Sequence, residues 1–197
     1  MGGAHEQTEH AEHIEHVAGS NRKIALLIAV IALFLAFSET LGKSAQTTAI
    51  SANVEASNLW AFFQAKTIRM TTVRTAAESL SVAAGQENDP AAKAALQKQV
   101  DLWQNTAARY DDEPETGEGR KQLLARAKSS EHARDTAFAK YHQFEIASAA
   151  FQIGIVLASA SVITGMVILA WLAGGLGIVG VALMGVGLFA PHALHLV

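Results

Sequence analysis

The chain has 197 residues, of which 50% are hydrophobic, and it has a formal net charge of -3 and no cysteine. The length allows one or two small domains, the lack of cysteine excludes disulfides and thiol chemistry, and the lack of a basic stripe gives nucleic-acid binding no support. The hydrophobic residues are concentrated: Ile24 to Phe37 is wholly apolar, and no Asp, Glu, Lys, Arg or His occurs from Ile146 to Pro191. Because about 20 apolar residues cross a bilayer as a helix, the sequence predicts an integral membrane protein.

The first 23 residues form a polar leader that contains the sequence EHAEHIEH, in which His10, His13 and His16 alternate with glutamates. Imidazoles one helical turn apart can share a divalent metal ion such as zinc. A strict three-residue step drifts around a helix, so one helix presents His10 and His13 together more easily than all three, and a site between subunits is one form of this hypothesis. The same residues form Glu/His pairs at i, i+4, which stabilise a solvated helix, and they could also form a pH-responsive contact. All three interpretations stay open, and no other cofactor is expected.

The first membrane helix is predicted at residues 24–41, with Glu39 in its last turn. This carboxylate is either a solvated helix end or a polar group of an interface or a pore, because intramembrane carboxylates are costly and often functional. No Gly or Pro occurs from Lys43 to Ala84, so the helix is expected to continue beyond the membrane. Apolar residues are sparse in this continuation, which indicates a partner helix rather than a thick core.

A cluster of turn residues, Gly85 to Pro90, predicts the end of this helix, and Pro90 suits the first turn of the next. The second helix carries a stripe that includes Leu96, Val100 and Trp103, and it ends at an acidic loop with two glycines. A third helix is expected to begin near Arg120 and to enter the membrane directly. The middle of the chain is therefore predicted as a helical hairpin or coiled coil.

The long apolar block is divided at Gly165, because this position leaves two segments that can each span a bilayer. Gln152 lies in the first of them and is expected to hydrogen-bond to another helix, and the glycines from Gly177 to Gly185 favour close helix packing. The predicted class is an all-α protein with three transmembrane helices. Its expected parts are a leader (1–23), a first membrane helix (24–41), an extramembrane helical domain (42–145), two further membrane helices (146–164 and 166–190) and a short tail (191–197).

The segment Asn58-Leu-Trp60-Ala-Phe62-Phe63-Gln64-Ala65-Lys66 resembles the pattern S-[DN]-x-W-x-[FY]-[FY]-Q-A-K of a bacterial membrane family known only as a domain of unknown function. The similarity extends to the Glu/His-rich leader, the membrane helices and the helical middle. The resemblance implies an architecture but leaves the function open, because the family has no assigned activity. Trp60, Phe62 and Phe63 are expected to make core or interhelix contacts rather than to line a ligand groove, and Lys66 is expected to snorkel or to pair with acidic residues.

Orientation follows from the flanking charges. Arg22 and Lys23 precede the first membrane helix and favour a cytoplasmic N-terminus with the middle domain in the periplasm of a bacterium. The opposite orientation is favoured by Arg126, Lys128, Arg134 and Lys140, but long loops cross the membrane largely regardless of charge. We therefore expect a multi-pass inner-membrane protein with its N-terminus inside.

No enzyme motif occurs: the chain has no phosphate-binding loop before a helix, no nucleophile elbow and no HExxH sequence. The expected function is therefore a non-enzymatic protein that self-associates in the bilayer and scaffolds or organises a membrane assembly. The alternatives are a subunit of an oligomeric channel or transporter, and a His-rich metal-binding membrane protein. The expected partners are the bilayer and other copies of the chain, with other protein partners unknown.

Overall fold

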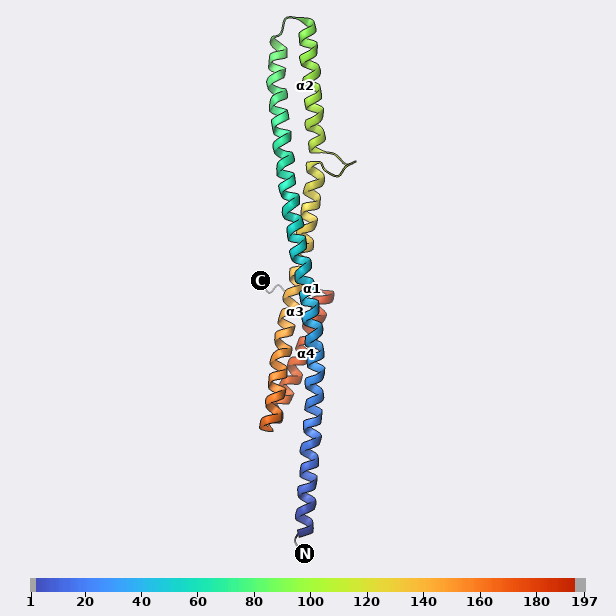
Figure 1. Ribbon diagram of the computed structural model, residues 1–197, viewed down its shortest axis with the longest axis vertical. Coiled ribbons are helices and arrows are strands. Elements are labelled where there is room, and N and C mark those ends of the chain that lie inside the picture. Colours follow the sequence, from blue (N-terminus) through green and yellow to red (C-terminus); the bar gives the residue numbers. More distant parts are fainter. Residues whose placement is uncertain (1–2, 194–197) are drawn as a thin grey trace. The chain divides into compact units, whose positions relative to one another are not determined.

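The computed structural model describes residues 3–193, with side chains from residue 22 onward. Its four helices are α1 (Gly3–Gln86), α2 (Pro90–Asp111), α3 (Arg120–Thr164) and α4 (Val167–Phe189), and no strand occurs in this range (Figure 1). Three of the helices, α1, α3 and α4, are long and apolar enough to cross a membrane. The predicted all-α class is confirmed, as is the presence of three helices able to span a bilayer.

The first break in the helical chain lies where the turn residues predict it. Helix α1 continues without interruption past the apolar block and ends at Gln86, and α2 begins at Pro90. The carboxylate of Asp89 accepts hydrogen bonds from the backbone N–H groups of Ala91 and Ala92, at 3.3 and 3.2 Å. This cap satisfies donors that the first turn of every helix leaves free, and proline at the next position has no donor to satisfy.

The second apolar block is broken at Gly165, as predicted. Gly165 has a φ of 72°, in the left-handed region where a side chain would be strained. The turn is supported by Ser161, whose hydroxyl donates to the carbonyl of Met166 at 2.9 Å. The chain thus reverses within two residues and leaves two separate apolar helices.

The structure divides into two units: a membrane unit (1–48 and 136–197) and a middle unit (49–135). In the membrane unit, Ile24 packs with Ala158 and Ile31 packs with Phe151, so α1 and α3 run antiparallel. Helix α4 joins them at Ala173 and Met184. Most outward-facing side chains of the apolar runs, among them Leu26, Ile163 and Ile178, are apolar and largely exposed, as a bilayer solvent requires.

Small residues let the three helices of the membrane unit approach closely. A Cβ atom at Gly180 would lie 2.5 Å from Cε1 of Phe151, and one at Gly187 would lie 3.1 Å from Cβ of Gln143. By contrast, a Cβ atom at Gly174, Gly175 or Gly185 would meet nothing within 4 Å. Half of the glycines in α4 are therefore used by packing inside one chain, and the others leave open surface.

In the middle unit, α2 runs antiparallel to α1. Only three residues connect the two helices, and the Lys66 amine of α1 lies 5.2 Å from the ring of Tyr110, near the far end of α2. The main core cluster is small and consists of Leu59, Leu123 and Ala127, with aromatic residues of α1 packed against it. Single buried residues such as Met70, Val100 and Ala107 extend this core along the unit. A core of this size contributes little stabilisation, which makes the polar contacts around it important.

Candidate functional site

The membrane unit contains two polar contacts between α1 and α3. Ser38 is fully buried, and its hydroxyl donates to the backbone carbonyl of Phe144 at 2.9 Å. One residue further, the amide of Gln152 donates to the carboxylate of Glu39 at 3.4 Å, and both side chains are exposed on the outside of the unit. Two polar residues that the sequence singles out separately are therefore brought together, and Gln152 makes the interhelical hydrogen bond expected of it.

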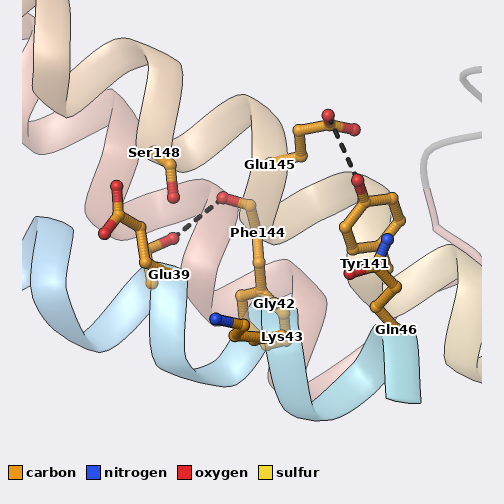
Figure 2. A pocket seen from close by; sticks show the side chains of 9 residues that line it. Glu39, Gly42, Lys43, Gln46, Tyr141, Phe144, Glu145 and Ser148 are labelled. Atoms are coloured by element: carbon orange, nitrogen blue, oxygen red, sulfur yellow. Dashed lines mark hydrogen bonds between the residues drawn. The ribbon is translucent and has the colours of Figure 1, made fainter. Parts of the chain in front are cut away.

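An open pocket with a volume of about 330 Å³ lies beside this pair, between α1 and α3 (Figure 2). Three charged residues, Glu39, Lys43 and Glu145, are among the residues that line it. This pocket could not be predicted from the sequence, because Lys43 and Glu145 are ordinary charges at the ends of apolar runs until the antiparallel packing brings them together. The lining residues are Ser38, Glu39, Gly42, Lys43, Gln46, Tyr141, Phe144, Glu145 and Ser148.

In the middle unit, Lys66 joins α1 to the acidic connection between α2 and α3. Its side chain is only 7% exposed, and its amine lies 3.5 Å from a carboxylate oxygen of Glu113 and 3.8 Å from one of Glu118. The amine also lies over the rings of Phe62 and Tyr110, at 5.7 and 5.2 Å from their centroids. The lysine is thus partly neutralised by the carboxylates and held over two π faces, which compensates for its burial.

Arg120, the first residue of α3, makes a second set of contacts with α1. Its guanidinium group donates to Thr67 at 2.9 Å, lies 2.7 Å from a carboxylate oxygen of Asp111 and stacks 5.1 Å from the ring centroid of Phe63. Trp60 contacts α3 further along, since its indole N–H donates to Glu131 at 2.9 Å. The residues of the Trp60–Lys66 segment therefore fasten α1 to the start of α3, and no ligand groove is needed to explain them.

The outer face of α1 is a third candidate. It consists of exposed residues spaced alternately by four and three positions, and none of them is charged: Ile50, Val54, Ser57, Ala61, Gln64, Ile68, Thr71 and Thr75. Ile50, Val54 and Ile68 are each more than half exposed. The sequence shows sparse apolar residues along this helix, but only the structure separates those that face α2 and α3 from those that face outward.

Asp112 of the acidic connection and Lys121 of α3 have shifted pKa values. Hydrogen bonds from Gln122 and then Lys121 lower the pKa of Asp112 below its ordinary value of 3.8, and the same contact raises the pKa of Lys121. Lys121 and Asp112 are 3.0 Å apart and exposed, so this pair is open to solvent, unlike the Lys66 contacts. The connection is therefore held both at an enclosed site and at an exposed one.

The metal hypothesis concerns residues whose side chains the structure does not describe. His10, His13 and His16 lie outside the range of described side chains, so metal binding there stays a prediction. Within residues 22–193, no group of three or more His, Asp or Glu residues is placed to hold a metal ion. A zinc, copper or nickel content measured by elemental analysis, and its loss on deletion of residues 5–16, would test the leader directly.

These observations indicate a helical membrane protein whose middle unit is held by two contact networks, around Lys66 and around Arg120. Residues 20–190 match the family model of DUF4337, a domain of unknown function, so the chain belongs to this family. The resemblance inferred from the sequence is thereby confirmed for the family. Comparisons with curated proteins and with solved structures found no match.

Proposed function

We propose that this chain is a non-enzymatic, self-associating membrane protein that scaffolds or organises an assembly in the bacterial inner membrane. The observation that carries the proposal is the uncharged, exposed outer face of α1 in the middle unit. A helix face that meets water normally carries charged residues, and here the charged residues Glu55, Arg69 and Arg74 all lie off the face. Burial of the outer face against another helix removes its large apolar side chains from water.

The occupant that fits best is the same face of a second copy. Copies in one bilayer share an orientation, so their α1 helices would be parallel, and the 4,3 spacing of the outer face is the spacing of a coiled-coil seam. The positions that flank the seam on one side, Ser51, Asn58, Ala65 and Thr72, are uncharged, so identical residues would meet without like-charge repulsion. The finer architecture that we propose for the middle unit is thus a hairpin with a coiled-coil seam.

Two hydroxyls, of Thr71 on the outer face and of Thr72 beside it, are already hydrogen-bonded within α1. The hydroxyl of Thr71 donates to the backbone carbonyl of Thr67 at 2.9 Å, and Thr72 makes the equivalent bond to Ile68. These hydroxyls are therefore satisfied inside their own helix and present methyl groups outward. The orientation that we propose places the N-terminus in the cytoplasm and the middle unit in the periplasm, because Arg22 and Lys23 precede the first span.

Cysteine crosslinking tests the pairing cleanly, because the chain has no cysteine of its own. Ser57→Cys lies on the outer face, and Ser81→Cys is an equally conservative change at an exposed position off that face. Mild oxidation in membranes is expected to give disulfide-linked dimers with Ser57→Cys, since equivalent Cα atoms in a parallel seam lie within disulfide range. Equal crosslinking of the two variants would contradict the proposed seam.

A second test measures the mass of the detergent-solubilised protein. Ile68→Asp places a charge in the seam and is expected to lower the assembled mass, whereas Leu102→Asp changes a similarly exposed apolar residue of α2 and should not. A strictly monomeric wild-type protein would refute self-association. Labelling Ser81→Cys in intact cells with a membrane-impermeant maleimide tests the proposed orientation separately.

A channel or transport subunit is the alternative, favoured by the Glu39–Gln152 pair. Both side chains are exposed on the outside of the membrane unit, where contact with lipid would be costly and contact with another copy or with water would not. Three helices per chain cannot enclose a pore, so this function also requires an oligomer. It predicts that Glu39→Ala changes ion flux in liposomes, whereas a scaffold predicts no change.

A further inference from the structure

The pocket of the membrane unit lies at the level where the two apolar runs end. Lys23 and Lys43 bracket 19 residues of α1, and Glu145 is followed by 19 residues to the end of α3. At 1.5 Å per residue each segment covers about 30 Å, the thickness of the hydrocarbon core. Lys43 and Glu145 both line the pocket, so it opens at the height of the lipid headgroups.

The charges in this pocket do not neutralise each other. Lys43 has no carboxylate within 4.0 Å among the residues that the structure describes, although Glu39 is one turn away on the same helix. Glu145 accepts a hydrogen bond from the hydroxyl of Tyr141 at 3.3 Å and lies 3.8 Å from His142. The pocket therefore offers one free ammonium group and a carboxylate that is only partly engaged.

The two groups point in opposite directions along the helices. Figure 2 shows the Lys43 amine directed toward the Glu39 end of the pocket and the Glu145 carboxylate directed toward Tyr141. The Glu39 end leads into the apolar run of α1, and the Tyr141 end leads away from the apolar run of α3. From the hydrocarbon outward, the pocket thus presents the Glu39 carboxylate, which accepts a hydrogen bond from Gln152, then the Lys43 amine, and then an acceptor pair, carboxylate and phenol.

This order matches a phospholipid whose phosphate lies next to its acyl chains and whose amine lies farther out. We propose that the pocket binds the phosphoethanolamine headgroup of a zwitterionic membrane lipid, with its phosphate at Lys43 and its ammonium group at Glu145 and Tyr141. The acyl chains would lie along the apolar outer surface of α1 and α3. The charge-assisted hydrogen bonds of both groups supply the selectivity.

Other lipid classes fit this pocket less well. An anionic headgroup would meet two carboxylates, Glu39 and Glu145, and one amine. A choline headgroup has no N–H donors for Glu145, and its quaternary ammonium is usually held by several aromatic rings, whereas Phe144 is buried and only Tyr141 is available. The primary ammonium of phosphoethanolamine uses the acceptors that are present.

The test is lipid binding to the full chain in detergent, measured by native mass spectrometry with dioleoyl phosphatidylethanolamine, phosphatidylcholine and phosphatidylglycerol. We expect phosphatidylethanolamine to bind about tenfold more tightly than the other two, the size of one charge-assisted hydrogen bond. Soluble glycerophosphoethanolamine at millimolar concentration should compete poorly, because it lacks the acyl chains. Effective competition would show a free headgroup to be sufficient and would overturn the assignment to lipid.

Two variants separate the two contacts. Lys43→Gln is expected to weaken binding of all phospholipids, and Lys43→Arg should retain it, whereas Glu145→Gln should abolish only the preference over phosphatidylcholine. The matched controls Lys93→Gln and Glu55→Gln change exposed residues of the middle unit and should leave lipid binding unchanged. Equal binding of the three lipids by the wild type, or unchanged binding by both pocket variants, would overturn the proposal. The assembled mass of each variant is measured in parallel, so a failure of self-association is distinguishable from a failure of lipid binding.

Discussion

The membrane unit and the middle unit hold their helices together by different means, and the difference follows from their solvents. In the membrane unit, glycine lets Phe151 pack directly against the α4 backbone, because lipid offers helices no hydrophobic driving force to associate. In the middle unit, a small core is reinforced by Lys66 and Arg120, which combine carboxylates with aromatic rings. Exposed apolar side chains are expected of the first unit, and on the second they support the proposed seam.

The largest effect on stability is expected from a substitution of Lys66 in the middle unit. Lys66→Ala leaves Glu113 without its buried partner and removes the contacts with Phe62 and Tyr110. We expect a loss of about 3 kcal/mol from the middle unit, because the change removes the buried partner of Glu113 and leaves this carboxylate only the exposed Arg109, at 3.3 Å. Arg69→Ala, one turn away and exposed, should cost less than about 0.5 kcal/mol.

Limited proteolysis of the connection at residues 112–119 measures this effect where it acts, and thermal loss of helicity measures it globally. The connection should be cleaved faster in Lys66→Ala than in Arg69→Ala. Equal cleavage of the two variants would show that Lys66 does not fasten the connection.

Gly180 gives the corresponding test in the membrane unit. Gly180→Ala would place a methyl group against the ring of Phe151, so α3 and α4 must separate or the ring must move. Overpacking of this kind costs about 2 kcal/mol. Gly185→Ala on the same helix meets nothing within 4 Å and should be neutral in a single chain. The measurement is the thermal stability of each variant in one detergent, and equal midpoints would exclude the close α3–α4 packing.

Trp60→Phe tests a hydrogen bond in the middle unit. The change removes the indole donor to the Glu131 carboxylate and keeps most of the aromatic surface against Phe63. We expect a loss of roughly 1.5 kcal/mol, the size of a hydrogen bond to a charged group. Trp103→Phe is the control, since its indole makes no hydrogen bond within the described residues, and denaturant unfolding followed by circular dichroism compares the two.

Gln143 offers a change that should stabilise. Its side chain is 1% exposed, and its carbonyl oxygen has no hydrogen-bond partner among the described residues. Gln143→Met keeps the length of the side chain and removes the unsatisfied acceptor, which should add about 1 kcal/mol to the membrane unit. Gln143→Glu should instead destabilise, because it buries a charge. A lower thermal midpoint for Gln143→Met would indicate that the amide is satisfied in the native protein.

The helices were predicted well from the sequence, because residues at the helix ends themselves determine where each helix stops. Pro90 and Gly165 lie at breaks that no tertiary contact is needed to explain, and the apolar blocks identify the segments able to span a membrane. Contacts between distant segments could not be predicted in the same way. Nothing near Lys66 in the sequence indicates that Glu113 and Glu118 are its partners, although an acidic loop directly before Arg120 is a signal for cation pairing.

Which face of α1 packs inward and which faces outward also could not be predicted from the sequence. Ile50, Val54 and Ile68 share one face by spacing, but spacing alone does not tell whether that face meets α2, α3 or solvent. The pocket required still more, since it depends on the antiparallel register that places Lys43 near Glu145. Local signals therefore determine where helices begin and end, and packing determines which of their residues are available for function.

The smallest expected effect is a dependence of stability on pH at the exposed end of the connection. The pKa of Asp112 is lowered in the folded chain by Gln122 and Lys121, so its contribution is present above the unfolded value of 3.8 and is lost as the pH falls through the folded value. The raised pKa of Lys121 acts in the opposite sense: its contribution is present below the unfolded value of 10.5 and is lost as the pH rises through the folded value.

Asp112→Asn should therefore flatten the acid side of the profile slightly and leave neutral pH almost unchanged, because solvent and salt screen an exposed pair. The thermal midpoint between pH 3 and 7, at low and at 0.5 M salt, measures this. An acid dependence in Asp112→Asn as steep as in the wild type would assign it to the other carboxylates of the connection. Such a result would sharpen the contrast with Lys66, since two ion contacts of one short segment would then differ in energy because of burial and the aromatic contacts of Lys66.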